Sequence, residues 1–171
     1  MVQSQQGAAG STDKLMNHPV KLREIIEAIE LQSDEMASYF NTKTGQIITI
    51  SDEEVGAVEE GDDPLDDYPE WQQDNIRIAR DFMENEDDYL TLPTKYDFNE
   101  YHIMEKFVLS LKDRKVSEVL YSSIKGKGAF RRFKDAVQRL ELSDEWYAYR
   151  DAALRQVAID WCESNQIPFK E

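Results

Sequence analysis

The chain has 171 residues, and its 35 Asp and Glu residues outnumber its 20 Lys and Arg residues, for a formal net charge of −15. One Cys cannot close an intrachain disulfide, and one Cys with two His cannot form a Cys/His zinc cage. The strong acidity argues against broad, sequence-independent binding to nucleic acid or to anionic membranes. These exclusions leave a soluble, acidic, globular protein of one domain or two small ones.

The negative charge is concentrated in residues 51–88, which hold 16 acids against Arg77 and Arg80. Residues 112–171 instead carry 12 bases and 10 acids, so the C-terminal part is slightly basic. The composition as a whole therefore opposes an anion site, but the distribution of charge does not.

The N-terminal residues 1–17 are rich in Gln, Ser, Gly and Ala and lack the basic and apolar regions of a signal peptide. We expect a disordered tail there, and a cytoplasmic protein with a reduced thiol at Cys162. No apolar run approaches the roughly 18 residues of a membrane span, so no membrane association is expected.

Residues 18–95 are expected to form an α+β part. Apolar spacing predicts a helix over residues 20–31, with Pro19 in its first turn. Two β-prone runs flank the turn-forming residues 41–45 and predict a β-hairpin. The further predicted elements are an acidic linker at 51–67, a helix from Pro69 that buries Trp71, Ile78, Ala79, Phe82 and Met83, and a strand at 89–92.

Residues 96–171 are expected to be helical. Asp97 and Glu100 have the spacing of a capping box, which predicts a helix to about residue 112. Further helices are predicted at 116–124, at 129–140 with Phe130, Phe133, Val137 and Leu140 on one stripe, and at 143–164. The predicted fold is α+β, with a small antiparallel sheet (the hairpin plus one strand), flanking helices and a helical C-terminal half; the two parts either stand apart or form one body.

A basic segment, residues 125–134, begins the predicted 129–140 helix. Gly126 and Gly128 lead directly into that helix, whose free N–H groups and dipole attract anions. Lys127, Gly128 and Arg131 are therefore candidate anion-binding residues. The pattern is not a P-loop, because Lys127 is followed by Gly128 and not by Ser or Thr. The alternative is an ordinary turn between helices with a solvated basic face.

Arg150 falls in the middle of the aromatic face of the last predicted helix, close to Trp146 and Tyr147 on a helical projection. An unpaired charge is costly to bury, so a guanidinium there needs a partner or a ring to stack on. One interpretation is a structural salt bridge or stacking contact. The other is an anion-recognising Arg in a pocket lined by Trp146 and Tyr147.

Other chemistry is weakly indicated. The acids of residues 51–88 do not follow the EF-hand spacing, so a solvated surface or a docking site for a basic partner is favoured over a metal site. His102 is expected to be a half-buried, hydrogen-bonded side chain, and Cys162 an inert thiol near the core. No nucleophile signature accompanies them, so we expect no cofactor and lean against an enzyme.

The motif Gly126-Lys-Gly-Ala-Phe-Arg-Arg-Phe-Lys-Asp135, followed by Trp146-Tyr147, Arg150 and Ala158-Ile-Asp-Trp-Cys162, resembles uncharacterised protein family 158 of the UPF series. Residues 20–28 and the Ser-Asp-Glu-Glu run from residue 51 fit the same pattern, so the resemblance spans about residues 20–168. It implies a bacterial protein without an assigned activity, and it supplies no catalytic residues.

The leading functional hypothesis is a non-enzymatic binding or regulatory module, in which residues 51–88 engage a basic protein and residues 126–134 add a second contact or an anion site. The alternative is a small-molecule or phosphate-binding protein, with or without enzymatic activity, that has a pocket around Arg150. Nucleic-acid binding ranks lower, because the stripe prediction places Phe130 and Phe133 in the core and leaves neither for base stacking. The oligomeric state is left open.

Overall fold

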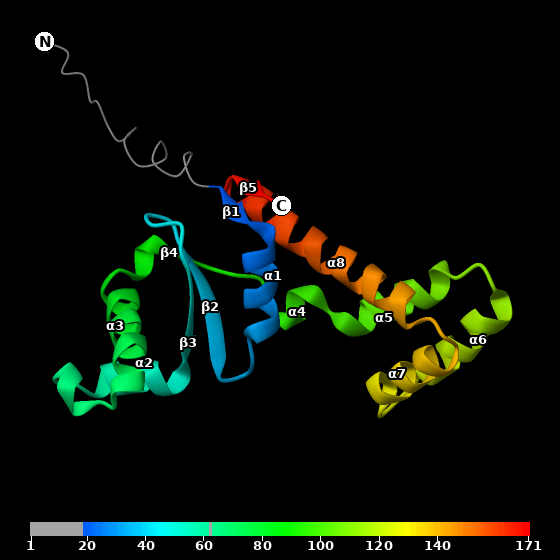
Figure 1. Cartoon of the computed structure of the whole chain (residues 1–171), viewed down its shortest axis with the longest axis horizontal. Helices are drawn as coiled ribbons and strands as arrows, with labels where there is room; N and C mark the ends of the chain where they lie inside the picture. Colours follow the sequence, from blue (N-terminus) through cyan, green and yellow to red (C-terminus); the bar gives the residue numbers. More distant parts are fainter. Residues whose placement is uncertain (1–18, 62) are drawn as a thin grey trace, which may run out of the picture. The chain divides into compact units, whose positions relative to one another are not determined.

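The computed structural model describes residues 19–61 and 63–171, so the tail expected at residues 1–17 lies outside the described residues. The described chain divides into two compact units. The first runs to Thr94 and also includes Ala158–Glu171, and the second is Lys95–Val157. The architecture is α+β, as predicted, with an antiparallel sheet in the first unit and a helical C-terminal half (Figure 1).

The first unit is built on a three-stranded antiparallel sheet in the order β3-β2-β4. The predicted hairpin is confirmed as β2 (Met36–Asn41) and β3 (Ile47–Ser51), and the predicted third strand as β4 (Tyr89–Thr91). The Asn41 side chain accepts hydrogen bonds from the amides of Lys43 and Thr44 at 2.9 and 3.0 Å and so shapes the hairpin turn. Gly45 completes that turn with φ +74°, a conformation that glycine adopts at little cost.

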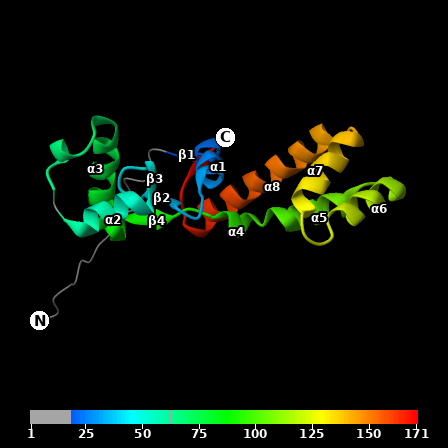
Figure 2. The ribbon, with the colours of Figure 1, turned by 90° about the horizontal axis from the view of Figure 1, so that it is seen from below.

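Helices cover both faces of this sheet (Figures 1 and 2). Successive side chains of a strand point to opposite faces, so neighbouring residues of β2 contact different helices. On β2, the Tyr39 ring lies 4.4 Å from the Phe82 ring of α3 (Glu70–Glu84), between ring centres. The neighbouring Phe40 is buried and meets Trp161 of α8 (Ser143–Ser164) edge to face at 5.8 Å. The indole N–H of Trp161 also donates to the carbonyl of Thr91, which ties the end of α8 to β4.

The first helix, α1 (Leu22–Leu31), begins two residues later than predicted. Val20 and Lys21 form a short strand, β1, which pairs in parallel with β5 (Phe169–Lys170). The amide of Val20 donates a hydrogen bond to the carbonyl of Pro168 at 3.0 Å, near the other end of the chain. Local apolar spacing carries no information about such a distant partner.

The acidic linker predicted at residues 51–67 is in large part helical, which corrects that prediction. Helix α2 (Asp52–Glu60) is closed at its N-terminus by a capping box between Ser51 and Glu54. The Ser51 hydroxyl accepts from the Glu54 amide at 3.2 Å, and the Glu54 carboxylate accepts from the Ser51 amide at 2.9 Å. Acids in the first turn also interact favourably with the helix dipole.

Helix α3 follows a single turn of 3₁₀ helix at Leu65–Asp67, and Pro69 is its N-cap. The predicted buried stripe is largely wrong, because Trp71 is 76% exposed and Ile78 and Met83 are exposed by 36% and 37%. Ile76, which that prediction omitted, is fully buried together with Ala79. At 100° per residue Trp71 lies about 140° around the helix from Ile76, so the two side chains point in different directions.

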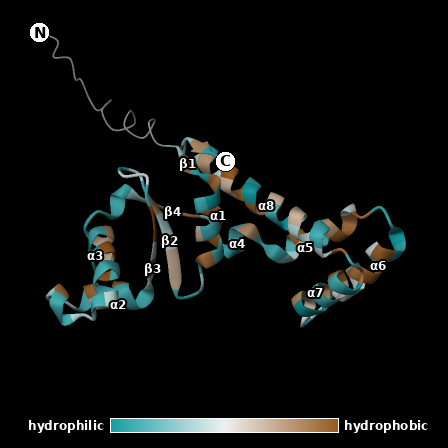
Figure 3. Cartoon of the chain, in the orientation of Figure 1, coloured by the Kyte–Doolittle hydropathy of each residue, from teal (hydrophilic) through white to brown (hydrophobic). Residues whose placement is uncertain are grey.

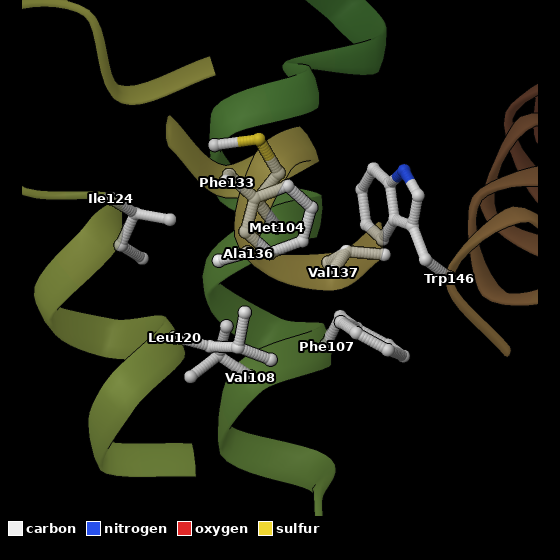
Figure 4. Packing of buried hydrophobic residues seen from close by; sticks show 9 residues of the cluster. All are labelled: Met104, Phe107, Val108, Leu120, Ile124, Phe133, Ala136, Val137 and Trp146. Carbon is white, nitrogen blue, oxygen red and sulfur yellow. The ribbon is translucent and has the colours of Figure 1, made fainter. Parts of the chain in front are cut away.

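The second unit is helical, as predicted, and consists of α4 (Lys95–Phe98), α5 (Glu100–Ser110), α6 (Arg114–Ser123), α7 (Ala129–Arg139) and the first part of α8. The capping box predicted at Asp97 is not formed. Asp97 lies inside α4, and Asn99, with φ +41°, caps α5 by accepting a hydrogen bond from the His102 amide. The core of this unit (Figure 4) comprises Met104, Phe107, Val108, Leu120, Ile124, Phe133, Ala136, Val137 and Trp146.

Hydrophilic residues prevail along α2 (Figure 3). Among the described residues, no helix combines the length and the apolar character that crossing a membrane requires.

Candidate binding surfaces

Arg150 is held by a carboxylate and an aromatic ring of its own unit. Its Nε donates to Oε1 of Glu100 on α5 at 3.0 Å, and its guanidinium carbon lies 5.3 Å from the centre of the Phe98 ring. The side chain is about one-fifth exposed. This is the geometry of the salt bridge and stacking contact that the sequence offered as one of two interpretations.

Trp146 and Tyr147, the aromatic residues predicted beside Arg150, point to different surroundings. Trp146 is buried between Phe107 and Phe133, with ring centres 5.4 and 4.8 Å away (Figure 4). Tyr147, one residue further and so about 100° around the helix, is 53% exposed.

The glycine loop before α7 is held together by Arg132, a residue that the sequence analysis did not single out. The Arg132 guanidinium donates to the carbonyls of Ser123, Lys125 and Lys127. Gly126 and Gly128 have φ +75° and +81°, and a Cβ on Gly128 would lie 3.1 Å from Nη1 of Arg132. The two glycines therefore allow the backbone conformation of the loop, and Arg132 stabilises it through hydrogen bonds.

The remaining basic side chains around α7 face solvent. Lys125 lies over the Tyr121 ring, 4.8 Å from its centre. Lys127, Arg131 and Lys134 are exposed, and none of them forms an ion pair with another residue in the described part of the chain.

Phe130, predicted to be a core residue of α7, is 46% exposed, which corrects the predicted stripe. Its ring meets Tyr101 edge to face, with centres 6.4 Å apart. The buried residues of α7 are instead Ala129, Phe133, Ala136 and Val137. The argument that left no ring of α7 for stacking therefore holds for Phe133 and fails for Phe130.

A hollow of about 370 Å³ lies between α7 and the start of α8; we call it the α7–α8 hollow. It brings the predicted Trp146 and Tyr147 together with Lys134, a residue of the basic segment. Lys127, Gly128, Arg131 and Arg150 do not line it. Its lining residues are Lys134, Val137, Gln138, Ser143, Trp146 and Tyr147.

In the first unit, α2, α3 and the turns around them carry a dense set of exposed acids; we call residues 52–88 the acidic helix pair. Arg77 is paired with Asp74 of the same helix, and Lys43 pairs with Asp88 at 2.6 Å. Burial, followed by the charges of Asp52 and Glu86, raises the pKa of Tyr39. The exposed acids are Asp52, Glu53, Glu59, Glu60, Asp63, Asp66, Asp67, Glu70, Asp74, Asp81, Glu84, Glu86 and Asp87.

Apolar side chains stand among these acids. Trp71 is 76% exposed, and Ile78 and Met83 are exposed by 36% and 37%. Large exposed aromatic rings within a charged rim are typical of protein interaction sites. No group of His, Cys, Asp and Glu within residues 19–61 and 63–171 has the arrangement of a metal site.

His102 and Cys162 show no catalytic geometry. His102 is exposed and not half-buried as predicted, and its Nδ1 lies 3.7 Å from a carboxylate oxygen of Glu105. Cys162 is fully buried, and burial, with a smaller effect of Glu163, raises the pKa of its thiol to about 11. The interpretation of Cys162 as an unreactive core thiol agrees with this environment.

The comparisons with known proteins bear on family membership. Residues 17–171 match the model of the Uncharacterised protein family (UPF0158). The UPF0158 protein PA5073 of Pseudomonas aeruginosa is 29% identical over 66 residues, which is 38% of this chain and 43% of that relative's length. No solved structure gives a significant match. Because the family model covers nearly the whole described chain, the protein belongs to the Uncharacterised protein family UPF0158.

Proposed function

We propose that the protein is a non-enzymatic binding module that docks a basic protein segment on the acidic helix pair. The observation that supports this most is the exposure of Trp71 within a surface of exposed acids. An exposed indole costs free energy in water, and a partner that covers it gains apolar burial and attraction to the acids together.

The folded state of residues 52–60 adds to this argument. In a mobile linker, the acids would have to be ordered when a partner binds, at a cost in conformational entropy. In α2, the Ser51–Glu54 capping box holds the backbone of the first turn in place before any encounter. A preformed acidic surface also steers a basic partner during its approach.

Recovery of partners from cell extract at two salt concentrations tests the proposal. The variant Glu59→Gln/Glu60→Gln/Glu84→Gln removes three exposed acids from the acidic helix pair. We expect the wild-type protein to retain basic proteins at about 0.05 M salt and to release them at about 0.5 M, where charges are screened beyond a few ångströms. The variant should retain several-fold less at low salt.

The control is Glu24→Gln/Glu27→Gln/Glu30→Gln, which removes the same number of exposed acids from α1 of the same unit, where Glu24 and Glu27 pair with Lys21 and Arg23. The control should keep wild-type recovery if the acidic helix pair is the docking surface. Equal losses in both triple variants would show a general effect of net charge and would contradict the proposal, as would full recovery by the first variant.

A further inference from the structure

Three exposed aromatic rings gather where α6 ends and α7 begins. Tyr101, Tyr121 and Phe130 are exposed by 40%, 37% and 46%. The rings of Tyr101 and Phe130 meet edge to face, with their centres 6.4 Å apart. Such a contact covers a face of only one of the two rings, so it leaves ring faces available to a third group.

The two tyrosines are anchored at neighbouring residues of the chain. The Tyr101 hydroxyl donates a hydrogen bond at 3.0 Å to the carbonyl of Ile124, whose side chain lies in the core (Figure 4). The ammonium of Lys125, the next residue, lies 4.8 Å from the centre of the Tyr121 ring. Contacts within the second unit therefore hold the rings in place without a ligand.

Cations without an ion pair accompany the rings. Lys125, Lys127 and Arg131 are exposed, and none of them pairs with an acid within residues 19–61 and 63–171. Lys127 belongs to the glycine loop that Arg132 holds through three carbonyls, so its backbone is ordered before any ligand arrives. We call this set of side chains the basic aromatic surface: Tyr101, Tyr121, Lys125, Lys127, Phe130 and Arg131.

The charge around this surface suits a polyanion. Residues 112–139 carry nine bases and three acids. Charges are screened over roughly 10 Å at 0.1 M salt, so the approach of a ligand depends more on the charges of this surface than on the net charge of the whole chain.

The rings favour one class of polyanion. Single-stranded nucleic acid offers phosphates to Lys and Arg and unpaired bases that stack on aromatic rings, whatever their sequence. A duplex keeps its bases stacked inside, so it gains little from exposed rings. An acidic protein segment offers carboxylates to the cations but few flat groups to the rings.

We propose that the basic aromatic surface binds single-stranded nucleic acid. Bases stack on Phe130 and Tyr101, and Lys127 and Arg131 hold phosphates of the same strand. Phe130, which the stripe prediction placed in the core and so denied to base stacking, is exposed in the structure. The surface lies wholly in the second unit and shares no residue with the acidic helix pair, so either proposal can fail without the other.

Fluorescence anisotropy of a labelled single strand added to the full chain tests the proposal. The probe is oligothymidylate of about 12 nucleotides, within the range of known single-strand sites. The competitors are the duplex of this strand with oligoadenylate and a polyglutamate of equal charge.

We expect the single strand to bind at about 0.05 M salt with a micromolar dissociation constant, and both competitors to bind at least several-fold more weakly. No binding at about 100 μM protein would overturn the proposal. Equal binding of the duplex would overturn the role of the rings, and equal binding of polyglutamate would assign the surface to an acidic protein instead.

The variant Phe130→Ala separates stacking from charge. It should weaken the single strand about tenfold without changing the salt dependence, because it removes a ring and no charge. The matched control is Tyr147→Ala, which removes a ring that is 53% exposed on α8 outside the basic aromatic surface. The control should bind as the wild type does. Equal affinities of the two variants, both with wild-type circular dichroism, would contradict the stacking role of Phe130.

The variant Lys127→Gln/Arg131→Gln measures the phosphate contacts. Each contact adds about 0.7 to the steepness with which log K falls against log salt, so this variant should lower the steepness by about 1.4. The matched control is Lys106→Gln/Lys115→Gln, which removes two exposed, unpaired cations of the same unit in the described chain. Equal changes in both double variants would show a general effect of net charge and would contradict the proposed surface.

Discussion

Arg150 and Trp146 show how far a single residue can be interpreted from a helical projection. The projection correctly places Arg150 on the same side of α8 as aromatic residues and requires a partner for it. It cannot name that partner, because Glu100 lies 50 positions away on α5 and meets Arg150 only in the folded unit. The projection also groups Trp146 with Tyr147, although the fold buries the first and exposes the second. A projection of one helix does not include the neighbouring helices that decide which side chains are covered.

The burial of Cys162 leads to a prediction about the reactivity of a single side chain. Its thiol is fully buried and has a pKa of about 11, so at pH 8 only about one thiol in a thousand is ionised. Because the thiolate is the reactive form, we expect 5,5′-dithiobis-(2-nitrobenzoic acid) to modify the native protein at least about a hundredfold more slowly than the urea-unfolded protein. Absorbance at 412 nm measures both rates. Fast modification of the native protein would contradict the buried, protonated thiol.

The raised pKa of Cys162 also gives the direction of a pH effect on stability. Burial favours the neutral thiol, so the folded pKa of about 11 lies above the ordinary value of 9.0. The contribution of this group to stability is therefore complete below about pH 9 and is lost as the pH rises through 11. Cys162→Ser, if it folds, should remove this part of the alkaline dependence, which urea unfolding at pH 8 and pH 10 would show.

At the scale of helices and strands, periodicity and turn chemistry predicted most elements but missed helix α2 and the short strands β1 and β5. The hairpin and the strand at β4 were predicted from β-prone runs and turn residues, and the helices of the second unit from their apolar spacing. Helix α2 was missed because it buries none of its residues, so its apolar pattern is weak. The signal that could have found it is the capping box Ser51-x-x-Glu54 at its start.

Replacing a glycine by alanine should have opposite effects on stability in α2 and in the loop before α7. Gly56 lies inside α2 with open space at its Cβ position, so Gly56→Ala should stabilise the protein by about 0.5–1 kcal/mol. Gly128 has φ +81° and faces Arg132, so Gly128→Ala should destabilise it by about 1–2 kcal/mol. Urea unfolding of the two single variants measures both effects. The same sign for both would contradict the assigned backbone conformation of one of these segments.

At the scale of the whole molecule, the sequence predicted the α+β class and the separation of charge. It did not predict that Ala158–Glu171 belong to the first compact unit, or that β1 pairs with β5. Both features join residues from opposite ends of the chain, and a local pattern does not encode such pairs. The acidic segment was correctly recognised as exposed, but only the structure shows that a preformed helix pair presents its acids around Trp71.

The central claim is that this acidic helix pair is where a basic protein docks. Its most direct test places the photo-crosslinking residue p-benzoylphenylalanine at position 71 and, as a control, at Leu31, which is 62% exposed on α1 of the same unit. Light should then join a basic protein to position 71, several-fold more than to position 31, and less after Glu59→Gln/Glu60→Gln/Glu84→Gln. Equal crosslinking at both positions, or crosslinking at 71 that persists in the triple variant, would contradict the claim.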